Sequence, residues 1–422
     1  MTDLVRSFIG IGILVLIGFL LSYNRRAVSW RTVLAALAVQ MAIGAFVLFV
    51  PVGQEILAKI AGGVTHVLEY GSKGTEFLFG GLVSAKMFEV FGGGGFVFAL
   101  RVLPTIIFVT AMIAVLYYLG IMRWIITILG MIFQKLLGVS KIESFCAVTT
   151  IFLGQNEMGA AAKPFIQQLK KQELFAIMTS GMASVAGAAL AGYAGLGVKI
   201  EYLLAASFMA IPGGLLFAKL ICPSTEQSEI RFDRFEFEEK RPANVIEAAA
   251  GGAALGLKIA VNVGAMLLAF IGLIALFNGL VGGVAGWMGF EGVTLEMLLG
   301  KVFAPLAYMM GVSAENAAFA GNLIGQKLIL NEFVAYVGLQ PYLQVPPAAG
   351  LAVIDSRTLA ILSFALCGFA NISSIAILSG AFGSIAPNLR SDVARFGLRV
   401  VAAATLSNLM SATIAGIFLS LK

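Results

Sequence analysis

A run of hydrogen-bonding side chains stands directly after an apolar segment near the middle of the chain. Residues 151–160 read IFLGQNEMGA, so Gln155, Asn156 and Glu157 follow Gly154. An amide offers both donors and acceptors, which suits the edge of a heterocycle better than a simple ion. A carboxylate at membrane depth costs roughly 2.5–3.5 kcal/mol on insertion scales, so we expect Glu157 to face a cavity or a partner rather than lipid. Gly154 allows close approach of the backbone.

A second polar set lies in the last third of the chain. Glu332, Asn371 and Ser374 offer acceptors and donors for hydroxyl groups, and Phe369 offers a face for a flat ring or a sugar. Other roles remain open for each residue. Either glutamate could be a structural anchor at a hairpin tip, Asn371 and Ser374 could join neighbouring helices, and Phe369 could serve packing alone.

The two polar sets belong to an internal repeat. GVSKIESFCAVTTIFLGQNE starts at Gly138, and GVSAENAAFAGNLIGQKLILNE starts at Gly311. Both segments begin Gly-Val-Ser, continue to Gly-Gln and reach an Asn-Glu pair, and each is followed by an uncharged stretch with a polar centre, around Ser184 and around Asn371. Coincidence in a chain rich in glycine and alanine is the alternative, but the shared order of these landmarks favours a repeat.

Composition places the repeat in a membrane. The 422 residues are 59% hydrophobic and only 12% charged, about half the charge of a typical soluble domain. Several uncharged stretches each reach the ~17–25 residues that a spanning helix requires. They are 7–24, 32–54, 102–122, 174–198, 202–218, 259–290, 358–389 and 400–421. Arg25-Arg26 rather than a small-residue cleavage site follows the first stretch, which favours a retained helix over a signal peptide. The sequence therefore predicts an all-α polytopic membrane protein with eight transmembrane helices.

Basic residues predict how these helices are oriented. Connections after the odd-numbered spans, with the adjoining span ends, hold 18 of the 28 lysine and arginine residues, so the positive-inside rule makes that face cytoplasmic and both termini extracytoplasmic. One span separates the two repeat units, each a hairpin plus two spans, so they enter the membrane from opposite faces. Secondary transporters use such inverted repeats, with broken segments that meet near the midplane.

The same features exclude other classes of protein. The net charge of +6 reflects topology and attraction to anionic lipid, because no basic face interleaved with aromatic residues indicates a nucleic-acid partner. Cys146, Cys222 and Cys367 lie far apart beside apolar spans, and His66 is the only histidine. Neither a disulfide framework nor a metal cluster is expected. Glu157 and Glu332 could be imagined as the acid–base pair of an intramembrane enzyme, but the sequence has no nucleophile–histidine dyad to accompany them. A channel is a second alternative to a transporter, because hairpins that meet in the membrane also build selectivity filters.

The segments between spans are expected to lie at the interfaces. Residues 74–100 read GTEFLFGGLVSAKMFEVFGGGGFVFAL, which predicts interfacial amphipathic helices broken at Gly92–Gly95. Residues 124–134 are too short to span and predict another interfacial helix. The polar segment 222–250 predicts a cytoplasmic loop.

Three motifs carry a family resemblance. GQNE, LNEFVAY and SFALCGFANISSIAIL resemble motifs of the concentrative nucleoside transporters, and the hairpin–span repeat resembles that family's architecture over nearly the whole chain. The resemblance implies two re-entrant hairpins in an inverted repeat, a homotrimer, and a transport domain that moves like an elevator against a scaffold. The resemblance implies two transport units, at 138–222 and 311–422, and two scaffold segments. The first scaffold segment, 1–137, holds the scaffold and interfacial helices. The second, 223–310, holds a cytoplasmic loop, the sixth span and an extracytoplasmic interfacial helix.

The resemblance also implies roles for particular residues. Gln155, Asn156 and Glu157 would read the nucleobase beside Gly154, and Glu332, Asn371 and Ser374 would hold the ribose. The pocket would be lined by Phe369, Ala189 and Ile259. Side-chain and backbone oxygens for sodium would come from Thr150, Leu153, Ser184 and Val185. No other cofactor is implied.

Two departures from the family pattern affect these expectations. Sodium-coupled relatives usually carry Asn where Thr150 stands, and proton-coupled relatives tend to carry a hydroxyl residue, so the expected coupling ion is sodium, with a proton as the alternative. The hairpin tip lacks the usual proline and has Met158-Gly159 instead, which frees the backbone φ and restores an N–H. The predicted function is cation-coupled nucleoside symport into the cell across a bacterial inner membrane.

Overall fold

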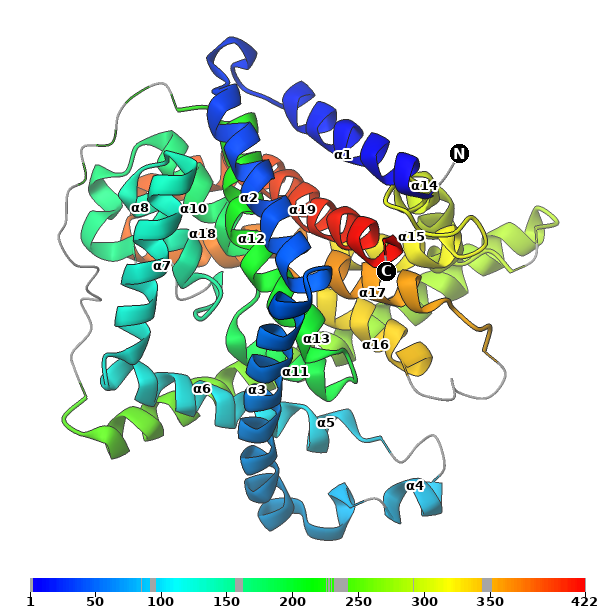
Figure 1. Ribbon diagram of the computed structural model, residues 1–422. Helices are drawn as coiled ribbons and strands as arrows, with labels where there is room; N and C mark the ends of the chain where they lie inside the picture. Colours follow the sequence, from blue (N-terminus) through cyan, green and yellow to red (C-terminus); the bar gives the residue numbers. More distant parts are fainter. Residues whose placement is uncertain are drawn as a thin grey trace.

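A computed structural model describes residues 3–84, 86–91, 96–155, 162–224, 226, 228, 230, 242–290, 292–343 and 351–421. These residues form helices and connecting turns, with no strand among them. Figure 1 shows the helices gathered around α12 and α19, with α3 extending away from the rest. The all-helical class that the sequence predicts is therefore confirmed.

The N-terminal part supplies α1 (Asp3–Leu20), α2 (Trp30–Leu48), α3 (Pro51–Phe79), α4 (Lys86–Phe91), α5 (Phe98–Arg101), α6 (Leu103–Tyr118) and α7 (Ile121–Leu137), with short 3-10 turns η1 (Arg25–Ala27) and η2 (Gly80–Val83). Pro51 starts α3 three residues after α2 ends, because proline suits the first turn of a helix. The second predicted span is therefore shorter than 32–54. Residues 74–79 belong to the continuous 29-residue α3, which the sequence analysis did not predict, and Gly92–Gly95 lie outside the described residues.

The first repeat unit contains α8 (Lys141–Thr149), η4 (Lys163–Gln168), α10 (Lys171–Ala183), α11 (Gly187–Gly195) and α12 (Ile200–Ile221). The second contains α15 (Ala317–Ile329), α16 (Glu332–Leu343), α17 (Ser356–Leu366), α18 (Ser373–Ile385), η5 (Pro387–Leu389) and α19 (Arg390–Ser420). In the first unit α8 and η4 precede a pair of helices separated by a break, and in the second α15 and α16 do; a long helix follows each pair. The order of elements thus repeats as the sequence repeats.

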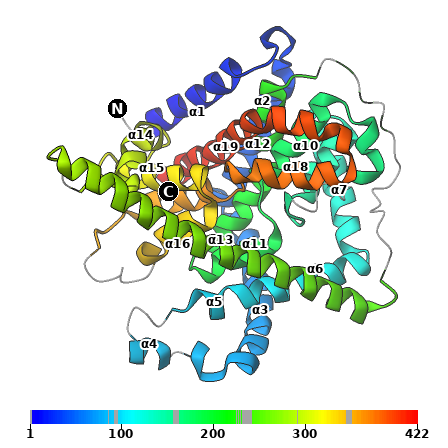
Figure 2. The same ribbon diagram turned by 180° about the vertical axis from the view of Figure 1, so that it is seen from behind.

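Two helices join the units. α13 (Val245–Trp287) has 43 residues, and α14 (Leu295–Met309) follows it. Asn244 caps α13 by accepting a hydrogen bond from the Glu247 N–H, so the helix begins well before the predicted span at 259–290 and takes in the end of the predicted loop at 222–250. Seen from behind, α13 runs across the molecule and packs along α6 (Figure 2).

The packing separates a buried centre from an exposed periphery. α12 and α19 have spanning windows that are 89% buried, whereas only 11% of the window of α13 is buried. α13 exposes large apolar side chains, among them Leu268 and Trp287. Exposed apolar faces of this extent are suited to lipid or to another protein surface.

Six helical segments are long and apolar enough to cross a membrane among the residues described here, and three shorter apolar helices accompany them. The long segments are 30–48, 98–118, 171–195, 200–221, 245–287 and 387–420, and the short ones are 4–20, 356–366 and 373–383. Two of the predicted spans are divided near their centres. Residues 174–198 divide into α10 and α11, and residues 358–389 include α17 and α18.

Candidate functional site

The breaks in the two divided helices bring distant parts of the chain together. Ser184 follows the last residue of α10 and is extended, with φ −101° and ψ 176°, and Cys367 follows the last residue of α17. The Phe369 N–H donates a hydrogen bond to the Ser184 carbonyl at 3.3 Å. The backbone of one break therefore satisfies the backbone of the other, as irregular segments inside a membrane protein require.

A buried polar network lies beside this junction. Gln155 Nε2 donates to Ser374 Oγ at 3.0 Å, and Asn371 Nδ2 donates to Glu332 Oε2 at 3.2 Å. Ser374 Oγ in turn donates to the Phe369 carbonyl at 2.6 Å and lies 3.1 Å from Asn371 Oδ1. Gln155 of the first repeat unit thus meets Glu332, Asn371 and Ser374 of the second in one network, although the two units' residues are separated by more than 170 positions in the chain.

The network retains capacity for a polar ligand. Gln155 is 5% exposed, and its Oε1 atom has no hydrogen-bond partner among the described residues. Leaving a buried amide oxygen unpaired is costly. A nearby donor from a ligand would therefore stabilise this arrangement, and Gln155 Oε1 is placed to accept it.

Glu332 has a second partner that the sequence analysis missed. The Tyr193 hydroxyl donates to Glu332 Oε1 at 2.9 Å, and Tyr193 is fully buried on α11. Its ring centroid lies 4.7 Å from that of Phe333 and 4.5 Å from that of Tyr336. The only local signal for Tyr193 was its position as a single polar ring among small residues, AGYAG.

The residues expected to bind a cation follow the ends of α8 and α10. Thr150 and Ser184 are buried, and each hydroxyl donates to a carbonyl of its own helix, Thr150 to Ala147 at 2.7 Å and Ser184 to Ser180 at 2.9 Å. Their oxygens keep lone pairs for an ion. The turn after α8 lies against the α10–α11 segment, since a Cβ on Gly187 would be 3.9 Å from the carbonyl oxygen of Phe152. Leu153 lies in this turn, and Val185 follows Ser184 in the break.

The remaining predicted residues have separate positions. Ala189 is buried on α11, one helical turn before Tyr193. Ile259 lies on α13, partly buried against the hydrophobic core. Gly154 is described and partly buried, whereas Asn156 and Glu157 lie outside the described residues.

Comparison with known sequences decides the family. Residues 202–416 match the family described as Na+ dependent nucleoside transporter C-terminus, and residues 9–82 match the corresponding N-terminus. Residues 99–199 match a family described as nucleoside recognition. The chain belongs to the concentrative nucleoside transporter family. It is accordingly a nucleoside transporter of a Na+-dependent family and a multi-pass membrane protein, and not an enzyme.

Individual relatives of this transporter agree over almost its full length. The putative nucleoside permease NupX of Escherichia coli is 55% identical, covering 99% of this chain and 100% of that protein. The nucleoside permease NupC of Helicobacter pylori is 47% identical over 99% of this chain and 98% of that protein. The mouse sodium/nucleoside cotransporter 1 is 33% identical over 97% of this chain, which covers 63% of the mouse protein.

Solved structures of the transporter CNTnw have the same fold. One, in an inward-facing substrate-bound state, has a TM-score of 0.95 and 51% identity, covering 100% of this chain and 99% of that chain. A variant of CNTnw in an outward-facing state has a TM-score of 0.94 and 51% identity, with the same coverage of both chains. The similarity therefore extends to relatives in more than one state.

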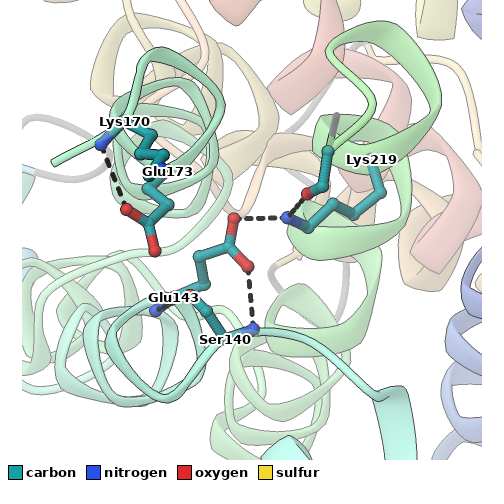
Figure 3. Close-up of polar contacts among 6 residues, drawn as sticks. Ser140, Glu143, Lys170, Glu173 and Lys219 are labelled. Atoms are coloured by element: carbon teal, nitrogen blue, oxygen red, sulfur yellow. Dashed lines mark hydrogen bonds and ion pairs between the residues drawn. The ribbon is translucent and has the colours of Figure 1, made fainter. Parts of the chain in front are cut away.

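A second buried polar cluster lies where the starts of α8 and α10 meet the end of α12. The Lys219 ammonium on α12 contacts Glu143 Oε1 on α8 and the Ser224 hydroxyl, and Glu143 Oε2 accepts from the Ser140 N–H at 3.0 Å (Figure 3). Glu173 on α10 likewise accepts a hydrogen bond from the backbone N–H three residues before it, that of Lys170, at 3.1 Å (Figure 3). This cluster borders a cavity of about 450 Å³. Ser140 and Glu143 form a capping box at the start of α8, and Glu173 accepts from the Lys170 N–H at the start of α10. Both glutamates therefore have a structural explanation as partners of helix N-termini.

Proposed function

We propose that this protein is a cation-coupled symporter that moves nucleosides into the cell, with sodium as the favoured ion. The observation that carries the proposal is the buried network joining Gln155, Ser374, Asn371 and Glu332 at the breaks of two helices. Amide groups from the first unit suit a nucleobase edge, and the carboxylate and hydroxyl of the second suit ribose. Relatives named nucleoside permease and sodium/nucleoside cotransporter support the same substrate class.

Within this proposal, each side of the network has a distinct role. Gln155, with Gly154, Asn156 and Glu157 of the same hairpin tip, contacts the nucleobase. Glu332, Asn371 and Ser374 hold the ribose hydroxyls, while Phe369, Ala189 and Ile259 line the pocket. Tyr193 is a positioning residue, since its hydroxyl holds one oxygen of Glu332.

Coupling follows from the position of the proposed cation residues. Thr150 and Leu153 lie in the turn after α8, directly before Gln155, and Ser184 and Val185 lie in the break after α10 that packs beside this turn. A cation bound there orders the turn and so presents Gln155 to the substrate, which raises nucleoside affinity. By linkage, the nucleoside tightens cation binding by the same factor. Thr150 supplies a hydroxyl, which also leaves proton coupling as the alternative.

We further propose how the chain sits in the membrane. Eight transmembrane helices and two re-entrant hairpins, built from α8 with the segment after it and from α15 with α16, form an inverted repeat. Units 138–222 and 311–422 form the transport domain, and 1–137 and 223–310 form the scaffold, against which the transport domain moves as an elevator. The exposed apolar face of α13 supports lipid contact and assembly as a homotrimer. The membrane is a bacterial inner membrane, with both termini extracytoplasmic.

The test is uptake of radiolabelled uridine into proteoliposomes under an inward sodium gradient or an inward proton gradient at matched membrane potential. Sodium-driven accumulation is expected. Accumulation driven by the proton gradient alone would change the proposed coupling ion from sodium to the proton. No accumulation under either gradient would refute cation-coupled nucleoside symport. Counterflow with unlabelled uridine distinguishes the transporter from a channel, because a channel gives no counterflow.

A further inference from the structure

An ammonium group lies buried close to the junction of the broken helices. Lys327, on α15, is 2% exposed. Its Nζ donates to the Ala365 carbonyl at 2.7 Å and to Asn408 Oδ1 at 2.6 Å. Among the described residues, no carboxylate lies within ion-pairing distance of Lys327. Carbonyl-type oxygens therefore solvate this charge, as they would solvate a bound metal cation.

Asn408 links Lys327 to the ends of both divided helices by hydrogen bonds. Its Nδ2 atom donates to the Ala183 carbonyl at 2.6 Å and to the Cys367 carbonyl at 3.0 Å. These carbonyls belong to the C-terminal ends of α10 and α17, where the helix dipole is negative and a cation is favoured. A Cβ atom on Gly368 would lie 2.2 Å from Asn408 Oδ1. The break is therefore shaped around the side chain that the ammonium holds.

The internal repeat relates this position to the proposed cation site. The order of elements matches α8 with α15, α10 with α17, and α12 with α19. In the first unit, Thr150 and Leu153 follow the end of α8, and Ser184 and Val185 follow the end of α10. In the second unit, Lys327 in the last turn of α15 reaches a carbonyl in the last turn of α17. The ends of corresponding helices thus carry neutral oxygen ligands in one unit and a lysine in the other.

We propose that the Lys327 ammonium is a tethered cation that fills, in the second repeat unit, the place that the coupling ion fills in the first. The inference rests on the proposed function only for the location of the exchangeable ion. The second junction then always has its own amino group in place, held by the Ala365 carbonyl and Asn408 Oδ1, while the first is ordered only when an ion is bound. Removing the lysine side chain without filling its space opens a second site for a small monovalent cation, bounded by the Ala365 carbonyl and Asn408 Oδ1.

The experiment compares thermal unfolding midpoints of the purified full-length protein in sodium chloride and in choline chloride at equal ionic strength. Lys327→Ala removes the charge and leaves space, whereas Lys327→Met removes the charge and fills the space. Lys258→Ala, at an exposed lysine on α13, is the control. In choline, both Lys327 variants are expected to unfold about 5 °C or more below the wild type.

Sodium separates the two variants. The midpoint of Lys327→Ala rises with sodium concentration more than that of the wild type, while Lys327→Met and Lys258→Ala follow the wild type. Equal sodium responses in all four proteins would overturn the proposal. If Lys327→Ala aggregates in choline, recovery of folded protein in sodium supports the proposal, and aggregation in both salts refutes it. A wild type that does not respond to sodium would count against the first site alone, because the response of Lys327→Ala reports the second.

Discussion

Replacing Lys219 by an uncharged residue is expected to lower the free energy of unfolding, because it leaves the buried Glu143 carboxylate without its ion-pair partner. The side chains of Lys219 and Glu143 are only 8% and 1% exposed, and they join α12 to α8. In Lys219→Met, Glu143 keeps the hydrogen bond from the Ser140 N–H but loses its ammonium partner (Figure 3). Breaking a buried ion pair from one side typically costs about 3–5 kcal/mol. The backbone donor and the N-terminus of α8 remain, so we expect about 3 kcal/mol.

The assay is the thermal unfolding midpoint of the purified protein at one heating rate, because unfolding of a large protein is often irreversible. The double variant Lys219→Met with Glu143→Gln removes the charge but keeps an acceptor for Ser140, so it recovers most of the loss. Lys59→Met is the matched control, since the Lys59–Glu55 pair is 75% and 68% exposed and such pairs contribute about 0–1 kcal/mol. A double variant as unstable as Lys219→Met would refute the argument.

Three further predictions address the site and its supports. Glu332→Gln is expected to weaken nucleoside binding about 10- to 100-fold and free nucleobases much less, because a charge-assisted hydrogen bond to ribose is lost; competition against labelled uridine measures both, and equal losses contradict the role. Gly368→Ala is expected to destabilise the protein by about 1–3 kcal/mol through overpacking against Asn408. Gly380→Ala is the control: it lies inside α18 with nothing within 4 Å of the added Cβ, so it is expected to keep or slightly raise the unfolding midpoint. Partial burial raises the pKa of Asp355, but hydrogen bonds from Thr358, Asn316 and Ser313 outweigh it and hold that pKa below its usual value. The resulting stability is present above the unfolded pKa of about 3.9 and is lost as pH falls through the lower folded value, so midpoints measured from pH 5 downward fall less steeply in Asp355→Asn; equal slopes would contradict this.

The positions of most apolar helices could be predicted because charges interrupt the chain at lengths set by the membrane. The repeat also allowed Gln155 and Ser374 to be placed in one site, since Gly-Gln and Asn-Glu recur in the same order. In the structure Gln155 Nε2 donates to Ser374 Oγ at 3.0 Å, so these two residues lie in one network. The roles of these residues in transport stay predictions.

Other features depend on partners that local sequence does not reveal. Uncharged stretches at 174–198 and 358–389 gave no sign of helix breaks, because the exposed carbonyls are satisfied by Asn408 and Phe369 from elsewhere in the chain. Glu247 and Lys258 precede the predicted span at 259–290, yet both lie within α13. Helix propensity and the Asn244 cap continue the helix through these charges, which a search for uncharged stretches overlooks.

The length of α13 has a mechanical consequence. Its 43 residues extend about 65 Å at 1.5 Å per residue, about twice the ~30 Å thickness of the hydrocarbon layer. A helix with apolar side chains exposed along this length fits a bilayer by inclining, and packing against its neighbours helps to set the angle. Because α6 and α16 pack against α13, a mismatch between α13 and the bilayer is expected to act on these helices as well. The length of the lipid chains is thus expected to influence the orientation of α13 and of the helices packed against it, without any molecule binding to a site.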